Sequence, residues 1–394
     1  MRLVTYLTAA ADIFLALYGI ASLSFFLRKK ERKLSCDKEE KRRYAILTAA
    51  RNEEDVIDDL LDALDKQDYP KELYDVYVIV NNCTDDTENV ARSFGAKIIE
   101  DDPSIDCKAA ALYFAFNRLK KESYDAYIIF DADNVPDKDF LSQINKVYGE
   151  DAKIIQGKRC GTKAQTSWVA SCYRIYYAFQ NSGFNAPRTQ SGLSASLNGS
   201  GWLVDKKLIE EKGFDCTSIT EDFEYTILMA LEDERVIYCE KAKTCDEFPE
   251  DLKTSMLQRK RWSFGMVQCM RRYERMLIEK GTDVCFDLAL VNLIPAVAMI
   301  AGIASLTNYI FFKKIPFLLY ILVVMTVYWL ILSVSALFAV SNNDDDVFRE
   351  MKGILAFPLF IISWYPSMIF AFFKKDYRWV PIEHKHIEDI KYRK

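Results

Sequence analysis

The stretch AYIIFDAD, residues 126–133, decides the fold. Its apolar run with aromatic and β-branched residues predicts a strand over Ala126–Phe130 that ends at Asp131. Two carboxylates, Asp131 and Asp133, then follow at the strand end. Ligands of open α/β sheets bind outside the carboxyl ends of the strands, so a polar site is expected here.

On both sides of this stretch, strand-like apolar runs alternate with helical patterns. This alternation predicts an α/β fold with a mostly parallel sheet and helices on both faces. Thr84 or Asp85 is the expected N-cap of the second helix. The predicted strands are Tyr44–Thr48, Val76–Val80, Ala96–Glu100, Ala126–Phe130 and Ala152–Gln156. The predicted helices are Glu53–Lys66, Asp85–Phe94, Cys107–Lys120 and Asp137–Tyr148.

Apolar segments flank this charged region. The chain has 394 residues with 52 Lys and Arg against 57 Asp and Glu, a net charge of −5. Only two charges, Asp12 and Asp287, fall in four apolar stretches that are long enough to cross a bilayer. These stretches are Leu3–Leu27, Cys285–Phe312, Ile315–Val340 and Gly353–Phe373. The pattern excludes both a simple soluble protein and a helix-only transporter.

The orientation follows from the basic residues. Leu3–Leu27 is too long for a signal-peptide core, and the basic run 28–33 behind it favours a cytoplasmic globular domain in the cell membrane. Three further crossings would place the basic C-terminal tail outside, against the same bias. Pro358 and Pro366 make Gly353–Phe373 the best candidate for a broken or re-entrant segment, although four crossings are expected.

Five regions are therefore expected. They are an N-terminal transmembrane anchor (1–33), a cytoplasmic α/β domain (34–250), an amphipathic interface region (251–283), three C-terminal transmembrane segments (284–373) and a basic tail (374–394).

Composition excludes several functions. The two histidines, His384 and His386, lie in the tail, which excludes a central catalytic histidine and a Cys₂His₂ zinc site. The ten cysteines are scattered without a C-x-x-C pair and are expected to be reduced thiols. The mild acidity gives no reason to expect nucleic acid.

Acidic and basic clusters supply the candidate chemistry. Asp131 and Asp133 could share Mg²⁺ or Mn²⁺ with a diphosphate, or form only a polar turn. Asp222, after Thr220 and Glu221, could be catalytic or could cap a helix. The motif QRKRW, residues 258–262, could hold diphosphate and sugar or simply belong to an interfacial amphipathic helix over Thr254–Tyr273.

Two weaker signals complete the candidate set. Lys108 could begin a helix that faces the nucleotide, or be a surface lysine. The segment NGSGW, residues 198–202, predicts a tight turn with a close backbone approach and an exposed indole on Trp202. Its alternative is an ordinary loop with a packed tryptophan.

The order of these motifs resembles that of membrane-embedded family 2 glycosyltransferases, which have a GT-A domain and a D, D, D, Q-x-x-R-W pattern. Cellulose, chitin and hyaluronan synthases are relatives in that family. The resemblance covers about residues 40–283 and the flanking membrane segments, and it is carried by ARNEE, NCTDDT, DAD, TED and QRKRW in that order.

The resemblance implies roles for matching positions. Asn81 stands where relatives usually have Asp, so the identity of the nucleobase is the least secure of the implied features. The implied nucleotide and diphosphate contacts are Ala50, Arg51, Asn52, Glu53, Asn81, Asn82, Asp85, Lys108, Asp131, Gln258, Arg261 and Trp262. Asp131 and Asp133 match the metal motif; Asp222, with Glu221 beside it, matches the catalytic base. The implied acceptor-side residues are Asn198, Gly199, Gly201, Trp202 and Trp262.

The implied activity is inverting transfer of a sugar from a nucleotide sugar, UDP-linked, to an acceptor hydroxyl, elongating a β-linked polysaccharide or oligosaccharide. One alternative is a glycolipid-forming enzyme that adds sugars to a membrane lipid. Another is a non-catalytic membrane protein that binds nucleotide sugars. The tail contains no R-x-x-x-R segment, so cyclic-nucleotide regulation is not expected, and the sequence leaves the sugar, the acceptor and the oligomeric state open.

Overall fold

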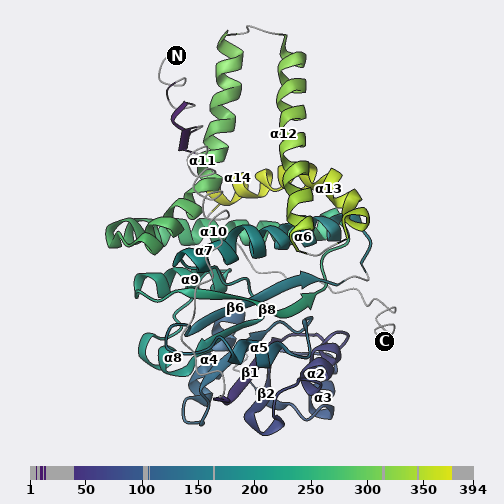
Figure 1. Cartoon of the computed structure of the whole chain (residues 1–394), viewed down its shortest axis with the longest axis vertical. Coiled ribbons are helices and arrows are strands. Elements are labelled where there is room, and N and C mark those ends of the chain that lie inside the picture. The colour runs from purple at the N-terminus through teal and green to yellow at the C-terminus, as the bar shows by residue number, and fades with distance from the viewer. Residues whose placement is uncertain are drawn as a thin grey trace.

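The computed structural model describes residues 40–374 except 101–104, 106, 163–164, 313–315 and 344–345, and also residues 6, 9–11, 13 and 14. The expected N-terminal anchor therefore lies largely outside the described residues, as does nearly all of the basic tail. Figure 1 shows three tiers: a sheet with its helices, a layer of crosswise helices, and two upright helices.

One eight-stranded sheet forms the base, in the order β3-β2-β1-β4-β7-β6-β8-β5. Strands β3, β2, β1 and β4 are parallel, and so are β6 and β8. Strand β7 is antiparallel to both β4 and β6, and β5 is antiparallel to β8. The mostly parallel α/β fold is confirmed, while the antiparallel strands were not predicted. The bounds are β1 Tyr44–Ala50, β2 Tyr74–Val80, β3 Lys97–Glu100, β4 Ala126–Phe130, β5 Val135–Pro136, β6 Ile154–Gly161, β7 Trp202–Asp205 and β8 Val236–Asp246.

Helices cover both faces of the sheet, because each face carries its own apolar core. On one face α4 (Lys108–Leu119), α8 (Lys206–Lys212) and α9 (Glu221–Leu231) pack against the strands. On the other face α2 (Ile57–Asp65) and α5 (Phe140–Asn145) do so. Residues of β4 are completely buried, as expected for a strand with apolar side chains on both faces.

Helix α3 (Thr87–Ser93) begins later than predicted. Its N-cap position is Asp86, which makes no side-chain capping bond, so the predicted cap at Thr84 or Asp85 is wrong by a residue or more. Asp85 nevertheless accepts a hydrogen bond from the amide of Thr87 at 3.2 Å. Its carboxylate therefore satisfies one of the free amides at this helix end.

The crosswise layer separates the sheet from the upright helices. It contains α6 (Trp168–Ala178), a π-helical turn (Phe179–Asn185), α7 (Ala186–Ser191) and the 29-residue α10 (Leu252–Lys280). In α10, Gly265 permits close packing, since a Cβ there would lie 2.7 Å from the Cβ of Thr220. This contact seats the start of α9 against α10.

Three segments are long and apolar enough to cross a membrane: Asp283–Gly302, Ile321–Ser341 and Val347–Phe373. Helices α11 (Asp283–Phe312) and α12 (Phe317–Ser341) stand upright in Figure 1. The third segment is broken into α13 (Val347–Ile362) and α14 (Tyr365–Phe373), as its prolines predicted, and both pieces run across the foot of the upright pair.

Buried polar contacts fasten the membrane helices to the globular domain. Arg188 of α7 pairs with Asp287 of α11 at 2.8 Å, which accounts for a charge inside an apolar stretch. Arg174 of α6 pairs with Glu350 of α13 at 2.9 Å. Separating a buried ion pair leaves uncompensated charges in the interior, which strongly destabilises the protein. These pairs therefore fix the membrane helices relative to the globular domain.

Candidate active site

The ends of β1 and β2 form one side of the site. Arg51 donates through Nε to the carbonyl of Asn81 at 3.2 Å and also hydrogen-bonds the Asn81 side-chain oxygen. The Asn81 amide nitrogen donates in turn to the carbonyl of Ile105 at 2.9 Å. The Asn81 amide is therefore held in one orientation at the sheet edge where Ala50 ends β1.

The two loops after these strands brace each other. Asn52, with a left-handed φ of 60°, accepts from the amide of Thr84 at 2.8 Å, and Asn82 also has a positive φ, of 51°. The amide of Glu53 donates to Thr87 Oγ1 at 2.9 Å. Asp85 accepts from the amide of Glu54 at 3.1 Å, so its carboxylate ties the two loops together.

Lys108 lies at the centre of the site. Its ammonium group pairs with Asp131, donates to the carbonyl of Gly199 at 2.7 Å, and lies 3.6 Å from the Glu221 carboxylate. Burial alone would lower the pKa of Lys108, but the charges of Asp131 and Glu221 raise it above its ordinary value. The lysine therefore stays protonated and joins three segments that are far apart in sequence.

Gly199 marks the point where the acidic side chains converge. It has a left-handed φ of 85°, and a Cβ there would lie 3.6 Å from an Asp222 oxygen and 3.8 Å from an Asp131 oxygen. The Arg159 guanidinium would lie 3.3 Å from the same point. Asp131 and Asp222 thus face one small space beside Gly199, where the left-handed φ favours glycine.

The electrostatic surroundings shift the pKa values of Asp131 and Asp222 in opposite directions. Burial alone would raise the pKa of Asp131, but the charges of Lys108 and Arg159 outweigh it and the pKa lies below its ordinary value. Burial and the neighbouring Glu221 charge raise the pKa of Asp222 to about 7. Neighbouring carboxylates with pKa values moved apart are characteristic of acid–base sites.

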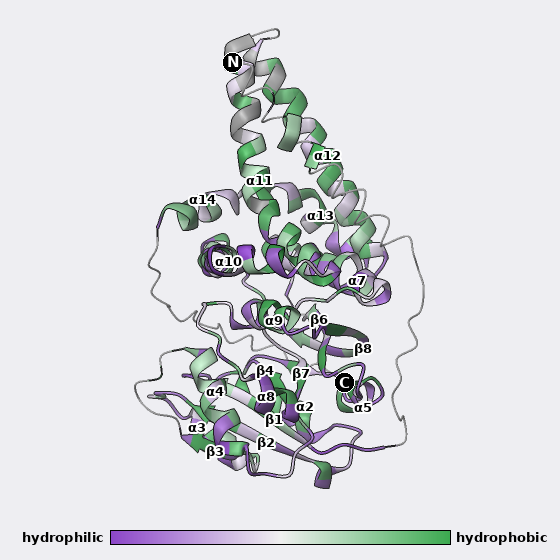
Figure 2. Cartoon of the chain, turned by 90° about the vertical axis from the view of Figure 1, so that its left-hand side faces the viewer, coloured by the Kyte–Doolittle hydropathy of each residue, from purple (hydrophilic) through white to green (hydrophobic). Residues whose placement is uncertain are grey.

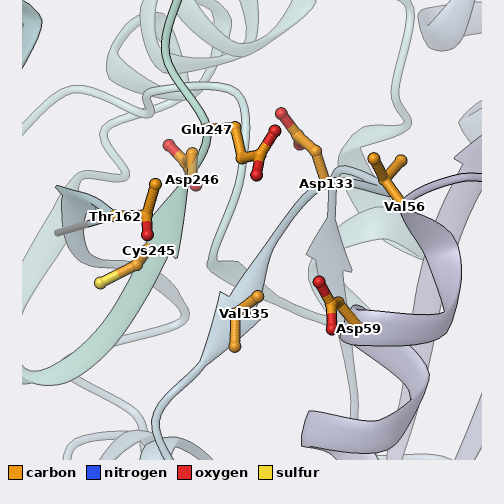
Figure 3. A pocket seen from close by; sticks show the side chains of 8 residues that line it. All are labelled: Val56, Asp59, Asp133, Val135, Thr162, Cys245, Asp246 and Glu247. Carbon is orange, nitrogen blue, oxygen red and sulfur yellow. The ribbon is translucent and has the colours of Figure 1, made fainter. Parts of the chain in front are cut away.

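Asp133 lines a small pocket next to this space (Figure 3). Asp246 and Glu247, which follow Cys245, line the same pocket, with Asp59 on its far side. No group of three or more His, Cys, Asp or Glu in the described part of the chain is placed to hold a metal by itself. The two carboxylates of 131 and 133 fit a hard cation that completes its ligands with phosphate oxygens.

The QRKRW segment lies on α10 above this space. In the part of the chain that the structure describes, Arg261 makes no hydrogen bond or ion pair, although its charge contributes to lowering the Asp131 pKa. Gln258 has a buried side-chain oxygen without a partner among those residues. Trp262 stacks on Tyr176 with ring centroids 5.9 Å apart, and its ring also contacts that of Trp364 in a tilted arrangement at 5.8 Å.

A family model described as "Glycosyltransferase like family 2" matches residues 42–265, more than half of the chain. The chain belongs to glycosyltransferase family 2. The matched range runs from β1 to the QRKRW motif on α10 and includes Lys108, Asp131 and Asp222.

The curated relatives of this family 2 chain share only about a quarter of its residues in the aligned regions. The probable glycosyltransferase YdaM of Bacillus subtilis (strain 168) is 25% identical over 255 residues, 62% of this chain and 60% of the relative. The cellulose synthase 1 catalytic subunit (UDP-forming) of Komagataeibacter xylinus is 24% identical, over 63% of this chain and 34% of the relative. The poly-beta-1,6-N-acetyl-D-glucosamine synthase of Staphylococcus aureus (strain MSSA476) is 25% identical, over 64% and 63%. The chain thus spans less than two-thirds of the length of each.

A solved structure supports the GT-A type of fold. The mannosyltransferase PcManGT from Pyrobaculum calidifontis, solved with GDP-Man and Mn²⁺, superposes with a TM-score of 0.64 at 17% identity. The match covers 92% of this chain and 99% of that chain, so it extends over the membrane helices as well.

One predicted feature of the family 2 site is wrong. Trp202 is completely buried rather than exposed, and it packs against Phe214 and Tyr225. It lies in β7 between β4 and β6, where both neighbouring strands exclude solvent. The indole therefore supports the Gly199 turn from beneath and cannot contact an acceptor, whereas Asn198 keeps a buried side-chain nitrogen without a partner among the described residues.

A buried network beneath the DAD motif escaped the sequence analysis. Asn134 accepts from the amide of Asp131 at 3.2 Å and donates to Asp246 at 2.6 Å. Asp246 also accepts from Arg159 Nε at 2.6 Å, and burial together with the Asp133 charge raises its pKa to about 7. Arg159 and Asp246 lie on β6 and β8, so only the pairing of these strands brings them together.

Tyr176 was missed as well. It lies on α6 just before the π-helical turn, and Gln180 of that turn donates to its hydroxyl at 2.9 Å. Burial raises the pKa of Tyr176, and the charge of Asp222 raises it further. π-Helical turns are frequent at functional sites and are the one local signal that could have indicated it.

The raised pKa of Asp222 predicts a cost in stability. Between its ordinary value of 3.8 and about 7, the folded chain retains a proton that the unfolded chain releases, so stability falls as pH rises through this window. Asp222→Asn should therefore raise the thermal unfolding midpoint at pH 8 relative to wild type, with no gain near pH 4. Purified protein without nucleotide or metal is the appropriate sample. Asp215→Asn, in the exposed loop before α9, should give the same difference at both pH values; an identical result for Asp222→Asn would contradict the assignment.

Proposed function

We propose that this chain transfers a sugar from a nucleotide diphosphate sugar, UDP-linked, to an acceptor hydroxyl with inversion, and elongates a β-linked polysaccharide or oligosaccharide. The observation that carries the proposal is the convergence of Asp222, Asp131 and Lys108 around the Gly199 turn. This arrangement places one base next to a charged cradle at the Gly199 turn.

Asp222 acts as the base. Its oxygen takes the proton of the acceptor hydroxyl while that oxygen attacks the anomeric carbon of the donor. A single direct displacement inverts the configuration, so an α-linked donor gives a β-linkage. The pKa of about 7 keeps Asp222 basic enough to accept this proton and ionised at mildly alkaline pH. Glu221 holds Lys108 and raises the pKa of Asp222 through its charge.

A second set of groups would neutralise the negative charge that develops on the leaving diphosphate. A divalent cation held by Asp131 and Asp133 would neutralise phosphate charge there. Arg261, which has no ion pair among the described residues, supplies a fixed positive charge from α10. The nucleobase end of the donor would lie towards Asn81, whose amide Arg51 already orients.

A glycan acceptor is favoured over a lipid. Two of the relatives named above are polysaccharide synthases, and the rings of Tyr176, Trp262 and Trp364 contact one another in one aromatic cluster around the QRKRW motif. A glycolipid-forming enzyme remains the second candidate, because α10 lies at the foot of the membrane helices. Mass analysis of the product separates them: oligomers support chain elongation, and a single sugar on a lipid supports the alternative.

The topology proposed with this function keeps the active site cytoplasmic. Helices α11 and α12 would cross the cell membrane as a hairpin and return the chain to the side of the globular domain. Asn343, just after α12, donates to the carbonyl of Ala178 at 3.2 Å, so the chain does re-enter contact with that domain. With α13 and α14 lying crosswise, the basic tail then follows the positive-inside rule.

Removal of divalent cations should stop the reaction. Treatment of the membrane-bound enzyme with EDTA should abolish release of UDP, because no divalent cation then neutralises the charge that develops on the diphosphate. Added Mn²⁺ or Mg²⁺ should restore it. Full activity in the chelator would reject Asp131 and Asp133 as metal ligands, while loss that no cation reverses would point to unfolding.

A further inference from the structure

An apolar groove lies between the first turns of α10 and helix α14, on the opposite side of α10 from Gln258. Leu252, Met256 and Leu257 line it and are 36%, 36% and 47% exposed. Ser367 of α14 forms part of its other wall. Three large apolar side chains exposed on successive turns of one helix mark a surface that contacts something other than water.

The α10–α14 groove lies near the foot of the candidate membrane helix α11. Figure 1 shows α10 and α14 running crosswise at the foot of α11, and Figure 2 shows α10 nearly end-on below α11. On α14, Phe370 is 42% and Phe373 is 83% exposed. Helix α14 also belongs to an apolar segment long enough to cross a membrane. The groove is therefore continuous with the lipid-facing part of the protein.

Lysines surround the apolar lining. Lys253 and Lys260 both line the groove. The ammonium of Lys260 lies 4.6 Å from the ring centroid of Phe370, and that of Lys374 lies 5.4 Å from the same ring. Lys253 and Lys374 form no ion pair with any described residue. Positive side chains around an apolar slot at a membrane surface complement a lipid with an anionic headgroup.

We propose that the α10–α14 groove binds one acidic phospholipid of the bilayer. An acyl chain lies against Leu252, Met256 and Leu257, and the phosphate lies between Lys253 and Lys260. The proposed lipid site does not depend on which reaction the active site catalyses.

The bound lipid would fix the height of α10 relative to the membrane. Arg259 of α10 is completely buried and donates to the carbonyl of Phe360 at 2.6 Å and to Ser363 Oγ at 2.9 Å, so α10 and the break between α13 and α14 are held together. Because Gln258 and Arg261 occupy the same helix, a lipid in the groove would also set the position of the QRKRW motif.

Photo-cross-linking of the full chain in nanodiscs tests this. Photoactivatable phosphatidylglycerol, diluted into phosphatidylcholine, should label residues 252–260 and 365–374, several-fold more than photoactivatable phosphatidylcholine does. Lys253→Glu combined with Lys260→Glu should reduce phosphatidylglycerol labelling to the phosphatidylcholine level. The charge-matched control, Lys207→Glu with Lys241→Glu on the exposed surface of the globular domain, should leave it unchanged.

Several results would overturn the site. They are equal labelling by the two lipids, unchanged labelling in the groove variant, adducts confined to α11 and α12, or cross-links to a second copy of the chain through the groove. If the glutamate variant does not fold, Lys253→Gln with Lys260→Gln provides the same test, because it removes both charges and keeps similar side-chain lengths. If the wild-type chain is labelled by phosphatidylglycerol as expected but transfers no sugar, the result counts against the proposed function and not against the lipid site.

Discussion

Asp222→Asn should lower the rate of sugar transfer by roughly 10²–10⁴-fold, the range that a positioned general base contributes. Asparagine has nearly the same shape as aspartate but cannot take the acceptor proton. The diphosphate cradle of Lys108, Asp131 and Arg261 stays in place, so the affinity for UDP should change little. Release of UDP and equilibrium binding of UDP, measured on the same preparation, separate the two effects.

The control for this variant is Asp215→Asn, which alters an exposed carboxylate in the loop before the same helix and should retain normal turnover. Near-normal turnover of Asp222→Asn would rule out the base. Loss of UDP binding together with turnover would show that Asp222 holds the site together instead.

Arg261→Met should lower transfer by about 10²–10³-fold, the loss that follows removal of one preorganised group that stabilises transition-state charge. Arg261 is half-buried and forms no ion pair in the described part of the chain, and its charge helps to lower the pKa of Asp131. Methionine retains an unbranched apolar side chain on α10 while removing the charge. Steady-state kinetics with the donor varied is the measurement.

The matched control is Arg275→Met, fourteen residues further along the same helix. Arg275 pairs with Glu279 at 2.6 Å on the exposed surface, far from the DAD motif, and its loss should leave turnover unchanged. Equal effects of the two variants would assign the loss to the stability of α10. An unchanged rate for Arg261→Met would remove this residue from the diphosphate cradle.

The parallel half of the sheet could be predicted from local sequence because its strands are short and are built around apolar runs rich in β-branched and aromatic residues. Ala126–Phe130 has the predicted bounds. Strand β7 was hidden by the two glycines before it: Gly199 and Gly201, both with positive φ, indicate a turn, and only pairing with β4 and β6 makes Trp202–Asp205 a strand. The same pairing buries the indole that was expected to be exposed.

The candidate site was predictable where motifs follow strands or begin helices. Asp131, Asp222 and Lys108 were found in this way, and the structure brings them together. Arg159 and Asp246 were not, since each lies inside a strand or at its end with no local pattern, and only the pairing of β6 with β8 brings Arg159, opposite Thr244, within hydrogen-bond reach of Asp246 two residues further on. Residues that act through long-range pairing leave no signal at short spacing.

Base-assisted sugar transfer is tested most directly by incubating membranes that contain the full chain with a panel of labelled nucleotide sugars. Both nucleotide release and the mass of labelled products are then measured. With one donor, we expect release of the nucleoside diphosphate in step with incorporation of sugar into β-linked product, and neither in membranes that carry Asp222→Asn. Release of nucleotide without any glycosidic product, or an equal product yield from the Asp222→Asn membranes, would contradict a site built for base-assisted transfer.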